Sequence, residues 1–272
     1  MEISNFLIIL VGLPASGKST LAKSLKEQLI EKFGVVEEQV SIIDPDLIRN
    51  YFVKNLNEFD YTLEPKIRVE NLENVEKELK NNKFVISDDL NYYRSMRHDL
   101  KSIAVRVGVP YFIIHLKTPI LTCLKWNNER GTPIPEDVIY KINEKMDKFD
   151  RYNWDFPVYS IDLSAVGDID EKSQEILDTI NMNLQLKAKT AEIPKKKEIE
   201  EKVVSRNEEL DLLTRKIVSK IINEKGISLD TKKISKLRKR FLKKNVESSL
   251  SNDDIAENFK NFIENELKNL RK

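Results

Sequence analysis

The segment Gly12 to Ser19, which reads GLPASGKS, constrains the fold more strongly than any other part of the sequence. The apolar run Phe6 to Val11 precedes it and is typical of a buried strand. The stretch Thr20 to Phe33 follows it and has the pattern of an amphipathic helix. The spacing G-x-x-x-x-G-K-S between a strand and a helix predicts a P-loop, whose backbone N–H groups surround the phosphates of a nucleoside triphosphate.

The residues of this loop have separate expected roles. We expect Lys18 to contact the outer phosphate oxygens and the Ser19 hydroxyl to bind Mg²⁺. The dipole at the start of the following helix favours the same anion. In the alternative interpretation, the glycines only end a strand and Lys18 is solvated. The predicted ligands are ATP and Mg²⁺, and the residues expected to bind ATP are Gly12, Leu13, Pro14, Ala15, Ser16, Gly17, Lys18, Ser19 and Thr20.

Composition excludes several classes of protein. The longest early apolar run is far shorter than the roughly 20 residues of a membrane-spanning helix, so we expect no membrane partner and a cytoplasmic location. Cys123 is the only cysteine, which excludes an intramolecular disulfide and a cysteine-based zinc site. The net charge of +1 conceals an asymmetry, because residues 191–272 hold 21 basic and 15 acidic residues whereas residues 1–190 hold 25 and 30. The basic part suggests a polyanionic partner.

The alternation of short apolar runs with longer amphipathic stretches predicts an α/β fold. The expected strands are Phe6 to Val11, Val40 to Ile43, Phe84 to Ile86, Tyr111 to Leu116 and Phe156 to Ile161. The expected helices between and after them are 20–33, 47–55, 65–81, 92–107, 119–130, 136–148 and 169–187. This order predicts a P-loop kinase-like, doubly wound, parallel five-stranded sheet, with ligands at the carboxyl ends of its strands.

Three further helical patterns follow the sheet region, at 208–224, 230–245 and 253–270. They predict a small C-terminal all-helical domain. A charge-dense stretch containing Pro194 separates the two regions and is typical of a linker. We therefore expect a catalytic domain at 1–190, a linker at 191–204 and a basic helical domain at 205–272.

Acidic residues follow two of the expected strands. Asp88 ends the strand that begins at Phe84, where a carboxylate can reach Mg²⁺ beside a P-loop. The alternative is that Asp88 and Asp89 only cap the next helix. Asp46 follows the second strand and can accept the proton of an attacking hydroxyl, with Arg49 one helical turn later as a cation for phosphate or substrate. The alternative is an N-cap at Asp46 with Arg49 as its surface partner.

A lid is expected after the fourth strand. Arg130 ends the helix there and can neutralise the transferring phosphoryl group. A basic residue followed by Gly131 is also a common helix ending. Trp126, on the same helix, is by residue type more often a core or interface residue than a platform for adenine.

The segment Lys232 to Lys244 is cationic and contains no acid. Its apolar residues Ile234, Leu237, Phe241 and Leu242 form one helical face. The expected RNA-binding residues are Lys232, Lys233, Lys236, Arg238, Lys239, Arg240, Lys243 and Lys244. A solvated helix face is the alternative.

The chain resembles the archaeal O-phosphoseryl-tRNA(Sec) kinases in six segments: Gly12 to Thr20, Asp46 to Arg49, Asp88 to Arg97, Glu129 to Gly131, Lys145 to Trp154 and Thr214 to Ser219. The resemblance implies ATP-dependent phosphorylation of the seryl hydroxyl of Ser-tRNA(Sec), a step toward selenocysteine. It implies that Asp46 is the base or hydroxyl-orienting acid and Arg49 a cation on the substrate side. It also implies that Lys18 contacts the β- and γ-phosphates, while Ser19 and Asp88 lie on the Mg²⁺ side.

The sequence departs from this family in the lid. The family pattern resembles R-x-x-x-R, whereas Trp126 occupies the first position and only Arg130 matches. Lys125 is a neighbouring cation, but an ammonium group does not reproduce a planar guanidinium.

The alternative functions to such a kinase are a tRNA-dependent ATPase of the Elongator-associated type, a small-metabolite kinase and an RNA-binding adaptor. The sequence does not determine the oligomeric state, and a homodimer is one of the states considered.

Overall fold

The structure is a computed structural model of the chain that describes residues 5–52, 63–190, 210–211, 213–218, 231–245 and 250–269. The chain divides into two compact units, Met1–Lys189 and Thr190–Lys272. The expected linker, 191–204, lies outside the described residues. No helix in the described ranges has the length and apolar character needed to cross a membrane.

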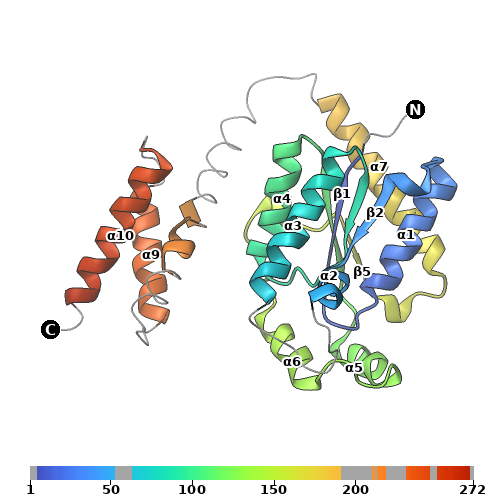
Figure 1. The fold of residues 1–272 in the computed structure, drawn as a ribbon, viewed down its shortest axis with the longest axis horizontal. Helices are drawn as coiled ribbons and strands as arrows, with labels where there is room; N and C mark the ends of the chain where they lie inside the picture. Colours follow the sequence, from blue (N-terminus) through green and yellow to red (C-terminus); the bar gives the residue numbers. More distant parts are fainter. Residues whose placement is uncertain are drawn as a thin grey trace. The chain divides into compact units, whose positions relative to one another are not determined.

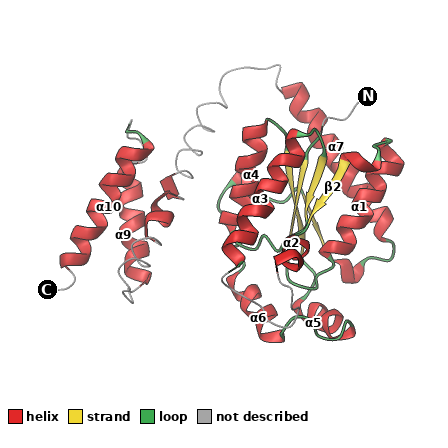
Figure 2. Ribbon diagram, in the orientation of Figure 1, coloured by secondary structure: helices red, strands yellow, loops and turns green. Residues whose placement is uncertain are grey.

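A parallel five-stranded sheet forms the centre of the first unit, as the sequence predicts (Figures 1 and 2). Its strands are β1 Leu7–Gly12, β2 Val40–Ile43, β3 Phe84–Ser87, β4 Tyr111–Leu116 and β5 Tyr159–Ile161, in the order β2-β3-β1-β4-β5. Leu7 of β1 pairs with Val85 on one side and with Tyr111 on the other. The carboxyl ends of β1, β2 and β3 therefore meet at one edge of the sheet.

Helices cover both faces of the sheet (Figure 1). The helices of this unit are α1 Lys18–Phe33, α2 Pro45–Phe52, α3 Glu64–Lys80, α4 Arg94–Val107, α5 Ile120–Glu129, α6 Glu136–Lys145 and α7 Ile169–Thr190, of which α1 and α7 cover one face and α3 and α4 the other. Side chains of β1 alternate between two cores: Ile8 and Leu10 pack with α1 and α7, whereas Leu7 and Ile9 pack with α3 and α4. A smaller cluster of Leu13 with residues of α5 and α6 lies beside the loop that follows β1.

The boundaries differ from expectation at two places that have a physical cause. The helix after β1 begins at Lys18, two residues before the expected start, because Gly17 already occupies its N-cap. The fifth strand begins at Tyr159, three residues after the expected start at Phe156. Pro157 has no N–H to donate, and the first backbone bond to the neighbouring strand comes from Val158, whose N–H donates to the Ile113 carbonyl (2.9 Å).

The second unit is helical in its described residues. It contains α9 Thr231–Asn245, α10 Asn252–Asn269 and a helical stretch within 210–218. The remainder of the helix expected at 208–224 lies outside the described residues. Leu210, Phe241, Ile255, Phe259 and Ile263 form its buried core. This core unites the three segments and fixes which side of α9 faces inward.

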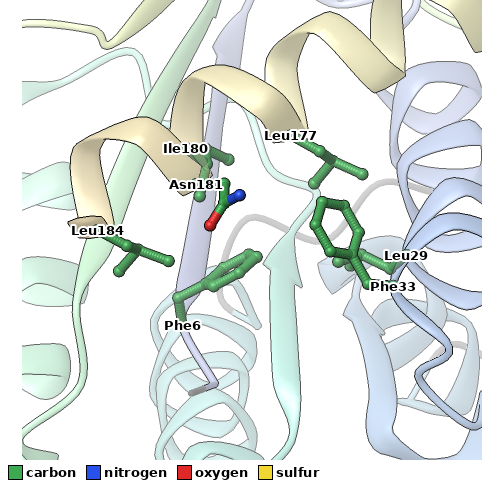
Figure 3. A pocket seen from close by; sticks show the side chains of 7 residues that line it. All are labelled: Phe6, Leu29, Phe33, Leu177, Ile180, Asn181 and Leu184. Atoms are coloured by element: carbon green, nitrogen blue, oxygen red, sulfur yellow. The ribbon is translucent and has the colours of Figure 1, made fainter. Parts of the chain in front are cut away.

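A small apolar pocket lies between the start of β1, the end of α1 and α7 (Figure 3). Its lining residues are Phe6, Leu29, Phe33, Leu177, Ile180, Asn181 and Leu184. Because Phe6 precedes β1 and Phe33 ends α1, the pocket lies at the edge of the sheet opposite the P-loop. With Asn181 as the single polar group in its lining, it offers little to bind a polar ligand.

A buried ion pair fixes the loop that follows β3. Arg97 and Asp155 are both fully buried, with Nε to Oδ1 at 2.5 Å and Nη2 to Oδ2 at 2.7 Å. Arg97 also donates to the carbonyls of Asn91 (3.0 Å) and Tyr92 (3.1 Å), and Arg94 donates to Asp155 through Nε (3.1 Å). One carboxylate thus bonds to two guanidinium groups, and Arg97 in turn holds the segment after Asp88 in place.

We predict that Asp155→Asn lowers the free energy of unfolding by about 3 to 5 kcal/mol, because it leaves buried cationic charge uncompensated. Asp150→Asn is the control, since Asp150 is 68% exposed and lies 3.4 Å from the same Arg94. Its removal should change stability by less than about 1 kcal/mol. Urea denaturation measures both effects, and similar losses in the two variants would contradict the assignment.

Candidate functional site

The P-loop connects β1 to α1 through a tightly packed turn. Gly17 has φ 93° and is the N-cap of α1, a conformation that glycine adopts without steric cost. A Cβ atom on Gly12 would lie 2.7 Å from Ser16 Oγ, so the close approach of these residues requires glycine. Thr118, two residues after the end of β4, donates its hydroxyl to the Ser16 carbonyl (3.0 Å). The neighbouring strand therefore holds the loop in place.

Lys18 is buried beneath this loop. Its Nζ donates to the carbonyls of Leu13 (2.6 Å) and Gly12 (3.2 Å). Burial lowers the pKa of Lys18 below its usual value, while the negative charges of Asp88, Asp89 and, more weakly, Asp46 raise it. These electrostatic interactions place the predicted acids of β2 and β3 around the P-loop lysine.

Ser19 and Asp88, the two residues expected on the Mg²⁺ side, lie beside each other. Burial raises the pKa of Asp88, which is 6% exposed, whereas a side-chain hydrogen bond with Ser19 and the charge of Lys18 lower it. The backbone N–H of Asp88 donates to the Ile43 carbonyl at the end of β2 (2.9 Å). The backbone of Asp88 is thus held by the sheet itself.

Asp46 and Arg49 lie together on α2. Nη1 of Arg49 contacts Asp46 Oδ1, and Glu64 of α3 accepts two bonds from the same guanidinium, at 2.9 and 3.1 Å. The Asp46 side chain is 75% exposed, against 24% for Arg49. The ion pair expected from the spacing is present, and a carboxylate of α3 additionally orients the cation.

Asp44 is a member of this cluster that the sequence did not single out. Its Oδ1 accepts from the Asp46 N–H (2.8 Å), so Asp44, and not Asp46, is the N-cap of α2, with Pro45 in the first position of the helix. Burial raises the pKa of Asp44 to about 6, and the charges of Asp46, Asp88 and Asp89 contribute in the same direction. The signal that could have revealed it is the capping pattern Asp-Pro-Asp.

Asn91 connects the loop after β3 to the P-loop strand. It has φ 44°, and its Nδ2 donates to the Leu10 carbonyl (2.9 Å). The carbonyl of Leu90 accepts from the Gly12 N–H (3.2 Å). Asp89 bonds to the N–H of Leu90 and to Arg68 of α3. The interpretation of Asp88 and Asp89 as caps of the following helix is wrong, because Tyr93 is the N-cap of α4 and the side chain that accepts from its first N–H, that of Arg94, is Asp147 (2.9 Å).

The segment that we expect to act as a lid consists of α5 and the turn that follows it. Arg130 ends α5 with an exposed side chain, and its backbone N–H donates to the Asn127 carbonyl (3.3 Å). The Asn127 side chain is fully buried and exchanges hydrogen bonds with the backbone of Ile134. Lys125 is 73% exposed and lies 3.9 Å from Glu129. A contact of Arg130 with phosphate remains a proposal.

The second unit exposes a row of cations on α9. Lys236, Lys239, Arg240, Lys243 and Lys244 are exposed, and the side chains of Lys232 and Lys233 lie outside the described residues. We name the five exposed residues the α9 cation row. Arg240 also contacts Glu266 of α10 at 2.5 Å and lies over the Phe262 ring.

Arg238 corrects one expectation about this helix. It is 7% exposed and donates to the Asp211 carboxylate. Arg238 lies on the inward side of α9 with Leu237 and Phe241 because of its helical position, and its charge is compensated inside the unit. It is therefore unavailable for contacts with RNA phosphates.

The donor set fits a triphosphate with Mg²⁺. The Ser16 hydroxyl is buried in the P-loop and makes no hydrogen bond within the described part of the chain. Among the described residues, no three acidic, histidine or cysteine side chains form a preformed metal cage. Mg²⁺ does not require one, because it binds through one or two protein ligands together with phosphate oxygens and water.

We predict that Asp44→Asn flattens the pH dependence of stability. The folded pKa of about 6 exceeds the ordinary aspartate pKa of 3.8, so the group's contribution to stability is fully present below about pH 4 and is lost as pH rises through 6. Relative to the parent chain, the variant should gain stability between about pH 4 and 7, measured by urea denaturation without nucleotide or Mg²⁺.

The matched control is Asp168→Asn, which changes an exposed aspartate that accepts N–H bonds at the start of α7. Asparagine caps a helix about as well as aspartate, so both variants keep their caps. An equal change in the two variants would show that burial among the site carboxylates is not the cause.

Comparisons with known proteins show the family of the chain. The model of the family described as chromatin associated protein KTI12 matches residues 6–264. L-seryl-tRNA(Sec) kinase of Methanococcus maripaludis is 38% identical over 267 residues, which are 96% of this chain and 100% of that protein. The KTI12 homolog of Arabidopsis thaliana is 29% identical over 179 residues, which are 64% of this chain and 58% of that protein.

One solved structure shows the same fold. Kti12 of Chaetomium thermophilum, in complex with ADP-AlF3, aligns with a TM-score of 0.51 and 21% identity over 64% of this chain and 98% of that chain. The parallel sheet, the P-loop and these similarities together identify a P-loop kinase-like fold. The chain belongs to the KTI12 family, and over nearly its whole length it is a relative of the L-seryl-tRNA(Sec) kinase of Methanococcus maripaludis.

Proposed function

We propose that the protein is an ATP-dependent kinase that phosphorylates the seryl hydroxyl of Ser-tRNA(Sec), giving O-phosphoseryl-tRNA(Sec) for selenocysteine synthesis. The observation that carries the proposal is the exposed Asp46 carboxylate, held beside Arg49 at the sheet edge that also bears Lys18 and Asp88. A P-loop alone accounts for ATP binding. An exposed acid beside it supplies what an attacking hydroxyl needs. The name of the Methanococcus relative supports the choice of acceptor.

The chemistry divides among these residues according to their placement. Asp46 accepts the proton of the seryl hydroxyl while the seryl oxygen forms a bond to the γ-phosphorus. The bond between the γ-phosphorus and the β,γ-bridging oxygen breaks, and ADP leaves. Arg49, oriented by Glu64, supplies positive charge on the acceptor side. Lys18 exchanges its bonds to loop carbonyls for phosphate oxygens. Arg130 is assigned to the lid as a second cation for the transferring group.

Ser19 and Asp88 are the residues that we assign to Mg²⁺. The Ser19 hydroxyl would bind the ion directly, and the buried Asp88 carboxylate lies against that hydroxyl. When bound, Mg²⁺ neutralises charge on the β- and γ-phosphate oxygens. The sheet holds Asp88 independently of the ligand through its N–H bond to Ile43.

The helical unit is assigned to tRNA. The α9 cation row presents positive charge opposite the buried side of its helix, which suits the phosphates of a double-helical RNA. Two tRNAs charged with serine carry the same reacting group, so selection between them requires contacts away from the hydroxyl. A separate basic unit provides such contacts.

A second function has specific support. The family model and several relatives carry the KTI12 name, and a tRNA-dependent ATPase would use the same P-loop to hydrolyse ATP without an acceptor. The two functions differ in the fate of the γ-phosphate. Under hydrolysis, Asp46 would orient water in place of a seryl hydroxyl.

The decisive experiment incubates the protein and Mg²⁺ with γ-labelled ATP and Ser-tRNA(Sec), uncharged tRNA(Sec) or no RNA. We predict label on the aminoacyl serine only with charged tRNA, and we predict that Asp46→Asn slows this transfer about 10²- to 10⁴-fold with little change in ATP affinity. Asp137→Asn, an exposed acid on α6, should leave the rate unchanged. Free phosphate released with uncharged tRNA would favour the ATPase, and unchanged transfer by Asp46→Asn would remove Asp46 from the mechanism.

We predict a separate effect for the α9 cation row. The double variant Lys239→Ala and Lys243→Ala should weaken tRNA binding and lower the slope of log K against log salt by about 2, because each lysine bound to phosphate releases about one counterion. Lys260→Ala, an exposed lysine on α10 of the same unit, is the control. Binding titrations at several salt concentrations measure both, and equal slopes would place the RNA elsewhere.

A further inference from the structure

Arg68 of α3 contacts three groups around the loop that follows β3. Its Nη2 donates to the Met96 carbonyl (3.0 Å) and lies 3.4 Å from Asp99 Oδ2, while its Nη1 lies 3.4 Å from Asp89 Oδ2. Met96 and Asp99 belong to α4, which lies beside α3 on the same face of the sheet (Figure 1). One guanidinium therefore joins α3 both to α4 and to the acid that follows Asp88.

Both carboxylate oxygens of Asp89 are engaged in the structure. Oδ1 accepts from the Leu90 N–H (2.6 Å), whereas Oδ2 faces Arg68. The Leu90 carbonyl in turn accepts from the Gly12 N–H at the start of the P-loop (3.2 Å). The Asp89 side chain is 13% exposed. The acid is thus held in a fixed orientation, close to the loop that binds the nucleotide.

Electrostatic effects on Lys18 show how near Asp89 lies to the outer phosphates. Burial lowers the pKa of Lys18, and the charge of Asp88 is the largest effect that raises it. The charge of Asp89 raises the same pKa more than that of Asp46 does. Asp46 is largely exposed on α2, where it can meet an acceptor, whereas Asp89 is nearly buried beside Asp88. A carboxylate in the position of Asp89 is close enough to hold water against the γ-phosphate.

Water competes with the acceptor in every enzyme that transfers a phosphoryl group from ATP. In that reaction the water oxygen forms a bond to the γ-phosphorus and the water proton passes to a carboxylate. The bond to the β,γ-bridging oxygen breaks, which gives ADP and inorganic phosphate. The reaction is fastest when an acid faces the water, and Arg68 occupies the Asp89 oxygen that would do so.

An arginine suits this contact better than a lysine would. The donors of a planar guanidinium point in fixed directions, so Arg68 faces Asp89 and bonds to the Met96 carbonyl at the same time. Glu64, one helical turn earlier on α3, bonds to Arg49 of α2. Buried Ile67 anchors this part of α3. The helix therefore orients the cation on the acceptor side and engages the acid on the nucleotide side.

We propose that Arg68 is a positioning residue that keeps the Asp89 carboxylate from activating water, and thereby restrains hydrolysis of bound ATP while no acceptor is present. The inference rests on the nucleotide half of the proposed function and does not depend on the acceptor. Asp88 then serves the metal side, and Asp46 serves the acceptor. A residue needed only for folding would lower activity when removed, whereas this assignment predicts a gain.

The test measures inorganic phosphate released from ATP in Mg²⁺ buffer without RNA, using the full chain. Arg68→Ala should raise the rate about 10- to 100-fold, which is part of the roughly 10²- to 10⁴-fold that a positioned base contributes. The rise should disappear when Arg68→Ala is combined with Asp89→Asn, and it should persist when Arg68→Ala is combined with Asp46→Asn. Arg68→Lys, which keeps the charge without the planar fork, should give a smaller rise.

Arg106→Ala is the matched control. Arg106 also joins α4 to α3, because its Nε donates to Glu76 Oε1 (3.2 Å), but it lies in the last turn of α4, at the end of the sheet opposite the P-loop. Its removal should leave the hydrolysis rate at that of the parent. Urea denaturation and calorimetry with ATP check that each variant is folded and binds the nucleotide.

An unchanged or lower rate for Arg68→Ala would overturn the proposal, and so would a rise that survives Asp89→Asn or requires Asp46. If Arg68→Ala does not fold, Arg68→Lys decides by the same criteria: a rise that Asp89→Asn removes supports the proposal, and no rise overturns it. Transfer of label to serine is measured separately, with charged tRNA. Its absence would contradict the proposed acceptor without affecting these outcomes.

Discussion

Parallel pairing of β1 with β3 on one side and β4 on the other is the constraint on which the candidate site depends. This pairing places the P-loop between two sets of loops, which follow β2 and β3 on one side and β4 and β5 on the other. Those of β2 and β3 carry carboxylates, and those of β4 and β5 carry Thr118, Trp126 and Leu163. The polarity of the site, with acids at one end and apolar surface at the other, follows directly from the order of the strands.

Local pattern was sufficient for much of this architecture. The apolar runs predicted all five strands, and the P-loop spacing located the turn between β1 and α1. The spacing of Asp46 and Arg49 correctly indicated an ion pair, because residues three apart on a helix are neighbours. The sequence also contains the reason why β5 begins later than predicted. Pro157 has no N–H to donate to the neighbouring strand, so the predicted start at Phe156 could have been moved to a later residue.

The remaining features depend on contacts between distant segments. Arg97 and Asp155 are 58 positions apart, and nothing near either residue signals that they meet. The shifted pKa of Asp44 arises from burial and from carboxylates of another strand, neither of which a local pattern contains. Arg238 was obscured by its cationic neighbours, although its position between Leu237 and Phe241 places it on the inward side of the helix. The cationic composition of this segment suggested that Arg238 binds RNA, whereas the helical periodicity of its apolar residues correctly places Arg238 on the inward side.

The buried contact between Arg238 and Asp211 also restricts the rotation of α9 about its own axis. Turning this helix by one residue, about 100°, would bring a lysine or an apolar side chain against Asp211 and move the arginine charge away from its partner. The apolar core already selects the inward side of α9, and the buried charge pair adds a polar requirement for the same rotation. The apolar core and one internal charge therefore together determine the direction in which the outward charges point, and the α9 cation row acquires a defined pattern instead of a diffuse positive surface.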